Sequence, residues 1–296
     1  MSAEDTERSV LSPLDRRRPV VGNVIRVGSV AVVLGLVIAC AGPLLWLAKS
    51  AVSTTQDTLR EPLALWPNGI QLSNLWQAWT RISIGAYLVN TILIVVGIWL
   101  FSLVVALTGA YTISVLRPRF AKVLWVAILA TMFIPGSISL VSSYLNVLKL
   151  PIIGVNLVDT YWALWLPGSV SAFNILIVTR FFDALPRELF EAARIDGAGH
   201  FRVFWSLVLP LSKPIIGVVS LLTVIGAWQS FLWPLLVLPS PNLQPLSVAL
   251  PRLEKTAEMS LLMAGLFIAT LIPIALFLTF SRQFLHGAAQ AGALKG

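Results

Sequence analysis

The sequence predicts an all-α polytopic membrane protein with six transmembrane helices. The chain has 296 residues, of which 57% are hydrophobic, and its mean hydropathy is +0.86. Only 11% of the residues are charged, whereas soluble domains average about 25%. The long apolar runs reach about 20 residues, which is the length that a helix needs to cross a bilayer.

The predicted spans follow one another with more polar connections between them. They cover residues 27–48, 86–108, 123–145, 161–182, 215–238 and 261–280, and the second could continue to residue 115. The chain then divides into an N-terminal tail (1–26), a transmembrane domain (27–281) and a C-terminal tail (282–296).

Prolines interrupt the predicted spans. Each proline removes a backbone donor and can kink a helix. Such kinks could serve packing or act as hinges, and the sequence leaves both interpretations open. They include Pro135, Pro167, Pro234 and Pro273.

The distribution of basic residues predicts the orientation of the chain. Six spans place both termini on one side of the membrane. Of the 21 Lys and Arg residues, 15 fall on the side of the termini and 6 on the other. Basic residues accumulate on the cytoplasmic side of membrane proteins. We therefore expect both termini in the cytoplasm, together with the connection between the fourth and fifth spans. The basic residues lie in short clusters between apolar runs, so we expect a lipid bilayer around the chain and no nucleic acid.

The spans lack the residues that several functional classes need. Their interiors carry no Asp, Glu, Lys, Arg or His, although such residues commonly carry the coupling ion in secondary transporters. The chain also has no P-loop, HExxH or GxSxG motif. An ion-coupled transporter and a membrane-embedded transferase are therefore the weaker alternatives. Energy for active transport has to come from another chain, and no cofactor or metal is expected here.

The connection at residues 186–210, here called the coupling segment, is compact and charged. Pro186 suits the first position of a helix, and Glu188 and Glu191 suit its early turns. Ala192 and Ala193 are small and would let another surface approach closely.

Glycines divide the coupling segment into two predicted helices. Gly197 and Gly199 allow a sharp turn. The residues that follow place an apolar face at helical spacing: Phe201, Phe204, Trp205 and Val208. From these residues alone, the segment could lie on lipid headgroups or dock a soluble partner.

The coupling segment resembles the EAA loop of bacterial ABC importer permeases. In that loop, E-A-A is followed after three residues by G, then after nine residues by an aliphatic residue, one further residue and L-P. The matching residues are Glu191, Ala192, Ala193, Gly197, Leu207, Leu209 and Pro210. The resemblance extends over nearly the whole chain and is greatest to the carbohydrate branch, of the maltose-permease G-subunit type.

The resemblance implies a fold, partners and roles. The fold would be the MetI-like ABC permease fold with cytoplasmic EAA coupling helices, in the inner membrane of a bacterium. Its partners would be a homologous second permease, two copies of an ATP-binding subunit that holds ATP and Mg, and an extracytoplasmic solute-binding protein. Glu191, Ala192, Ala193, Gly197, Leu207 and Pro210 would couple the chain to the ATPase.

The expected cargo is a sugar or a sugar-like solute, such as an oligosaccharide, a disaccharide or glycerol phosphate. Aromatic rings stack on sugar rings and amides bind hydroxyls. The candidate residues along the substrate path are Asn174, Trp228, Gln229, Ser230 and Trp233. The family often has W-N-D or W-N-E where this chain has Trp228-Gln229-Ser230, so the acidic residue is missing here.

Overall fold

The computed structural model describes residues 19–62 and 64–293, with side chains described for 23–62, 64–275, 278 and 279. The remaining parts of the predicted tails, 1–18 and 294–296, lie outside the described residues. Every regular element within the described residues is helical. The α-helices are α2 (Pro19–Ala51), α3 (Thr55–Arg60), α4 (Ser73–Thr80), α5 (Ile84–Tyr111), α6 (Ala121–Thr131), α7 (Gly136–Leu148), α8 (Trp162–Ser169), α9 (Ala172–Asp183), α10 (Arg187–Ile195), α11 (His200–Val203), α12 (Leu209–Leu211), α13 (Lys213–Gln229), α14 (Leu232–Val237), α15 (Leu246–Leu253) and α16 (Met259–Ala293). Two π-helical turns, η2 (Thr112–Leu116) and η3 (Phe204–Val208), and one 3-10 turn, η4 (Pro241–Leu243), complete the set.

All six predicted spans are helical, but three of them are broken. Within the described residues, two helical stretches are long and apolar enough to cross a membrane alone, Asn23–Ala51 and Ile84–Leu116. The third predicted span is divided into α6 and α7, which meet at 109°. The fourth is divided into α8 and α9, at 42°, and the fifth into α13 and α14. The chain therefore does not form six unbroken membrane-length helices.

Local chemistry accounts for the breaks. Pro135 lies directly before α7 with extended backbone, and a proline disfavours helical geometry in the residue before it. Ser171 caps α9, because its hydroxyl accepts a hydrogen bond from the Asn174 amide at 3.2 Å. Pro234 has no N–H to offer the Ser230 carbonyl one turn earlier. The Ser247 hydroxyl donates to that carbonyl instead, at 2.7 Å.

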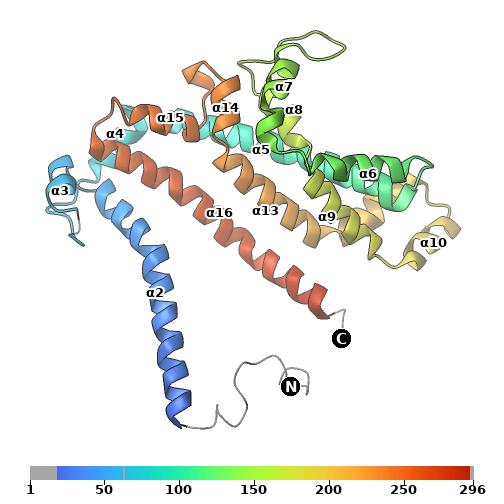
Figure 1. Cartoon of the computed structure of the whole chain (residues 1–296), viewed down its shortest axis with the longest axis horizontal. Coiled ribbons are helices and arrows are strands. Elements are labelled where there is room, and N and C mark those ends of the chain that lie inside the picture. Colours follow the sequence, from blue (N-terminus) through green and yellow to red (C-terminus); the bar gives the residue numbers. More distant parts are fainter. Residues whose placement is uncertain (1–18, 63, 294–296) are drawn as a thin grey trace.

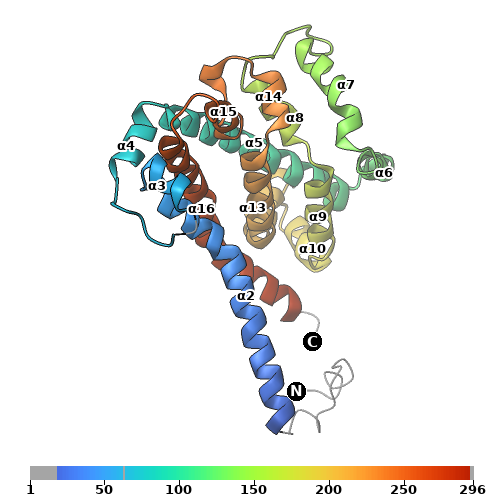
Figure 2. The same ribbon diagram turned by 60° about the vertical axis from the view of Figure 1, so that its left-hand side comes forward.

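Helix α5 forms the axis of the fold. It contacts α8, α9 and α13 along its length, and α16 packs beside α13, as both views show (Figure 1, Figure 2). Three buried apolar clusters follow one another along α5: the first includes Ile84 and Leu88, the second Ile94 and Ile98, and the third runs from Ala106 to Tyr111. The α4 and α10 ends of the molecule lie at opposite ends of this axis (Figure 1).

One glycine of α5 allows α8 to pack closely. A Cβ at Gly97 would overlap the indole ring of Trp165. Because glycine has no side chain, the two helices meet without displacing this ring. Helices α5 and α8, packed closely at Gly97, form one side of the centre of the molecule.

At the α4 end, Asn90 of α5 holds the segment that follows α14. Its side-chain amide donates to the backbone carbonyls of Asn242 (2.7 Å) and Gln244 (3.0 Å). The Tyr161 hydroxyl donates to the Asn90 Oδ1 at 2.8 Å. The first residues of α5 are thereby fixed to two segments that are distant in sequence.

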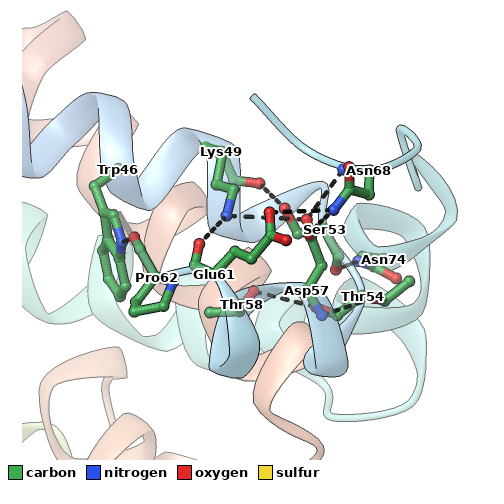
Figure 3. A network of polar contacts seen from close by, with 10 residues as sticks. All are labelled: Trp46, Lys49, Ser53, Thr54, Asp57, Thr58, Glu61, Pro62, Asn68 and Asn74. Atoms are coloured by element: carbon green, nitrogen blue, oxygen red, sulfur yellow. Dashed lines mark hydrogen bonds and ion pairs between the residues drawn. The ribbon is translucent and has the colours of Figure 1, made fainter. Parts of the chain in front are cut away.

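A buried ion pair closes the connection between α2 and α4 (Figure 3). The Lys49 Nζ lies 3.9 Å from the Asp57 Oδ2, and both side chains are buried. The backbone and side-chain amides of Asn68 donate to the Asp57 carboxylate at 3.2 and 2.9 Å. The carboxylate therefore compensates one buried cation and also accepts both donors of the exposed Asn68.

Replacing Asp57 by Ala should open this connection locally. Removing one partner of a buried ion pair costs about 3 kcal/mol, because the other charge is left without compensation. We expect amide hydrogen exchange in residues 49–74 to rise by about 100-fold, since 1.4 kcal/mol corresponds to a factor of ten. Glu61→Ala is the matched control, because Glu61 is exposed and its carboxylate makes one 3.5 Å contact. Equal exchange in the two variants would contradict the assigned role of Asp57.

Candidate functional site: the coupling segment and a central cavity

The coupling segment begins with a short helix held by one buried side chain. Helix α10 starts at Arg187, one residue later than predicted, and Pro186 precedes it in extended conformation. Phe190 is only 6% exposed and belongs to the apolar cluster at the end of α5. This residue is not among the predicted coupling residues. Phe190 lies three residues before Ala193, which packs on the same cluster. Residues at this spacing share one face of a helix, so the spacing could have indicated that Phe190 faces the body.

The opposite side of α10 is uncovered. Glu191 and Ala192 are exposed, whereas Ala193 is partly buried. Leu189 and Ile195 add exposed apolar surface to this helix. The E-A-A residues therefore do not share one environment: the first two are accessible to a partner, and the third packs toward the body.

Gly197 ends α10 in a Schellman motif. Its φ is +74°, a conformation that residues with a Cβ rarely adopt. The Gly197 amide donates to the Arg194 carbonyl at 3.0 Å, and the Ala198 amide donates to the Ala193 carbonyl at 2.9 Å. These two bonds are the pattern of this helix end. Gly197 thus sets the direction in which the chain leaves α10.

The second helix of the coupling segment differs from the prediction. Phe201 and Trp205 are 78% and 56% exposed, whereas Phe204 is partly buried and Val208 is fully buried. The four residues therefore do not form one face. The π-helical turn η3 adds one residue to a turn of the helix. The four residues therefore no longer follow the α-helical spacing that would place them on one face. Val203 is buried in the cluster as well.

The last two predicted coupling residues lie after this turn. Leu207 is partly buried and packs on the cluster at the end of α5. Pro210 is exposed within α12. The chain then bends by 76° at Ser212 into α13.

Contacts from α5 and α9 fix the coupling segment to the body. The Tyr111 hydroxyl donates to the His200 carbonyl at 2.9 Å, and its ring lies edge-on to Phe204 at 5.0 Å. The Asp183 carboxylate, at the end of α9, accepts from the Ser114 hydroxyl at 2.6 Å and lies 3.6 Å from the Arg117 guanidinium. The second half of the segment is therefore attached to the end of α5, and Arg187 of the first half lies 4.0 Å from the Asp183 carboxylate at the end of α9.

A cavity of about 370 Å³ lies between α5, α8, α9, α13 and α14. This volume falls in the usual range for small-molecule sites. Three of the predicted path residues line it: Asn174, Ser230 and Trp233. The Asn174 amide donates to the hydroxyls of Ser102 (3.2 Å) and Thr223 (3.0 Å).

The other two predicted path residues lie elsewhere. Trp228 packs against the apolar cluster around Ile84 and Leu88, near the α4 end. Gln229 is exposed as the last residue of α13 and does not line the cavity. Among the residues that the structure describes, no group of three or more His, Cys, Asp or Glu could hold a metal ion.

Comparison with protein families identifies the chain. The family model for the inner membrane component of binding-protein-dependent transport systems matches residues 87–287. The chain belongs to this family. The match includes the coupling segment, the cavity and all of α5 except its first three residues. The predicted ABC importer permease is thereby confirmed, and the alternatives of a secondary transporter and a transferase are set aside.

Individual permeases of this family are similar over most of the chain. The probable ABC transporter permease protein YurM of Bacillus subtilis is 29% identical over 263 residues, which cover 88% of this chain and 85% of the relative. The sn-glycerol-3-phosphate transport system permease protein UgpE of Yersinia pestis is 29% identical over 230 residues, covering 75% and 79%. UgpE of Agrobacterium fabrum is 27% identical over 266 residues, covering 86% and 92%.

A solved structure shares the permease fold. It is the crystal structure of a bacterial ABC transporter involved in the import of the acidic polysaccharide alginate. One of its chains matches with a TM-score of 0.76 and 22% identity, covering 93% of this chain and 99% of that one. The predicted permease fold is therefore confirmed at the level of the architecture.

Proposed function

We propose that this permease subunit moves a sugar or a sugar-like solute through the inner membrane, driven by ATP hydrolysis in a separate chain. The cargo class is supported by relatives named for glycerol-3-phosphate transport and by a fold neighbour named for alginate import. Hydroxyl-rich cargo also suits a cavity lined by amide, hydroxyl and aromatic groups. An extracytoplasmic binding protein delivers the cargo.

In this proposal, the chain crosses the membrane six times, through three long helices and three broken ones. Broken helices are common where transporters line a path, because neighbouring groups satisfy the freed backbone. Both termini and the coupling segment lie in the cytoplasm, as the excess of basic residues indicates. A homologous permease completes the path.

The coupling segment docks one of two ATP-binding subunits, which hold ATP and Mg. The observation that carries this proposal is the asymmetry of α10. Phe190 attaches one side to the body, while Glu191 and Ala192 leave the other side free for a partner. Gly197 fixes the turn after α10. Leu207 and Pro210 lie on the stretch that connects this turn to α13.

Reversing the charge of Glu191 tests this docking. We expect Glu191→Lys to reduce co-purified ATPase by at least about tenfold, because losing one partner of an interfacial charge pair costs more than 1.4 kcal/mol. The tagged permease is purified in mild detergent and bound proteins are measured by mass spectrometry.

Glu254→Lys is the matched control, since this exposed residue lies at the α4 end. The second permease should remain bound to both variants. The docking proposal is wrong if Glu191→Lys retains the ATPase as well as Glu254→Lys does, or if the wild-type protein brings down none.

A further inference from the structure

The central cavity is notable for its lack of charge. Among the described residues that line it, none is Asp, Glu, Lys, Arg or His. Its polar groups are the Asn174 amide and the hydroxyls of Ser171, Thr223 and Ser230. An anionic group entering the cavity would lose its hydration and find no cation in this chain. That loss is far more costly than the burial of a neutral hydroxyl.

The helix ends at the cavity do not supply a net charge either. Helix α9 begins beside it, and its positive end is capped by the Ser171 hydroxyl. Helix α13 ends beside it at Ser230, with the negative end of its dipole. Helix α8 also ends beside the cavity, at Ser169, and α14 begins beside it, at Leu232. Because two positive and two negative helix ends border the same space, their fields offset each other.

The apolar part of the lining suits a sugar ring. The indole N–H of Trp233 donates to the Ala163 carbonyl at 3.0 Å, so its donor is occupied and the ring contributes an apolar surface. Phe173 of α9 also lines the cavity, and its ring is exposed. Aromatic faces with a few hydroxyls and an amide are the chemistry that binds a neutral, hydroxylated ring.

We infer that this cavity is a cargo subsite for an uncharged sugar ring and that it excludes phosphate and carboxylate groups. The inference rests on the proposed function and narrows its cargo class. It separates this chain from the anionic solutes in the names of its relatives, glycerol-3-phosphate and the acidic polysaccharide alginate. Ser230 is central, because it lines the cavity with a neutral hydroxyl at the point where α13 ends.

The test compares two probes that differ only by a phosphate. The whole transporter, with its second permease and ATPase subunits, is placed in nanodiscs, and binding of glucose and of glucose 6-phosphate is measured by saturation-transfer NMR. We expect glucose to bind at least about tenfold more tightly, because the phosphate has no compensating charge.

Variants of α13 locate the binding. A Cβ at Gly226 meets no atom within 4 Å, and Gly226 lines the cavity, so Gly226→Phe fills the space without a backbone clash. Gly217→Phe is the matched control, since Gly217 lies on the same helix, also has free space, and does not line the cavity. Glucose binding should fall at least about tenfold in Gly226→Phe and remain within about twofold in Gly217→Phe.

Three results would overturn the inference: stronger binding of glucose 6-phosphate than of glucose, glucose binding that Gly226→Phe leaves unchanged, or no binding of either probe at millimolar concentration. The proposed function is assessed separately by ATPase co-purification. A transporter that retains its ATPase but prefers the phosphate probe would remain an importer with an anion-selective path.

Discussion

Gly197→Val is expected to reduce ATP-driven uptake by about 30-fold, because the strained backbone costs about 2 kcal/mol. Gly197 has φ +74°, where a β-branched residue is strongly disfavoured. A Cβ there meets no neighbouring atom, so the effect comes from the backbone alone. The Schellman bonds to Arg194 and Ala193 would be lost, and α10 would no longer hold its direction relative to the second half of the coupling segment. Uptake is measured with the whole transporter in proteoliposomes, with ATP inside.

Two further variants separate strain from bulk. Gly197→Asn should keep uptake within about threefold of wild type, because asparagine tolerates the left-handed region. Gly199→Val should also be mild, at under about 1 kcal/mol, since Gly199 has φ −68° and open space around it. If Gly197→Asn fails as completely as Gly197→Val, the turn conformation is not what transport requires.

Phe190→Ala is expected to detach α10 from the body and to uncouple ATP hydrolysis from transport. Removing a buried aromatic ring costs about 3 kcal/mol or more, and Phe190 is the buried residue of this helix. The uncovered face with Glu191 and Ala192 remains, so the ATPase should still bind. Its movement would then displace a loose helix, and hydrolysis would continue without cargo uptake.

The measurement combines hydrogen exchange with the ratio of uptake to hydrolysis. Amides of residues 187–199 should exchange about 100-fold faster in Phe190→Ala. Leu189→Ala is the control for exchange, because Leu189 is exposed and contributes little to attachment. Phe190→Leu should recover most of the coupling. Unchanged exchange in Phe190→Ala would show that other contacts, such as the Tyr111 bond to His200, hold the segment alone.

Much of the fold follows from the lengths of the apolar runs. Helices α2, α5 and α16 cover the predicted spans 27–48, 86–108 and 261–280, which are apolar runs of the length that a membrane-crossing helix needs. The breaks were predicted only as possible kinks at prolines. Hydropathy records how apolar a run is and not where it turns. Pro135 and Pro234 were recognised as possible kinks, but the Ser247 hydroxyl that satisfies the freed carbonyl lies 17 residues away.

The site was only partly predictable for the same reason. Asn174, Ser230 and Trp233 reach the cavity, whereas Trp228 and Gln229 do not. Trp228 and Gln229 are the last residues of α13, whereas Ser230 and Trp233 follow its end. The directions of these four side chains depend on that break in the helix. Phe190 was missed because it lies among charged residues, and its buried environment is supplied by α5 and α9. The roles of the coupling residues stay predictions until the variants are measured.

The continuity of α5 has a mechanical consequence. Its 28 residues form one rod of about 42 Å, bonded to the segment after α14 through Asn90 at one end and to His200 through Tyr111 at the other. A rigid rod that is bonded near both ends passes a displacement from one end of the molecule to the other. In the proposed importer, opening at one face of the membrane and closing at the other would then be coupled through one tilt of α5.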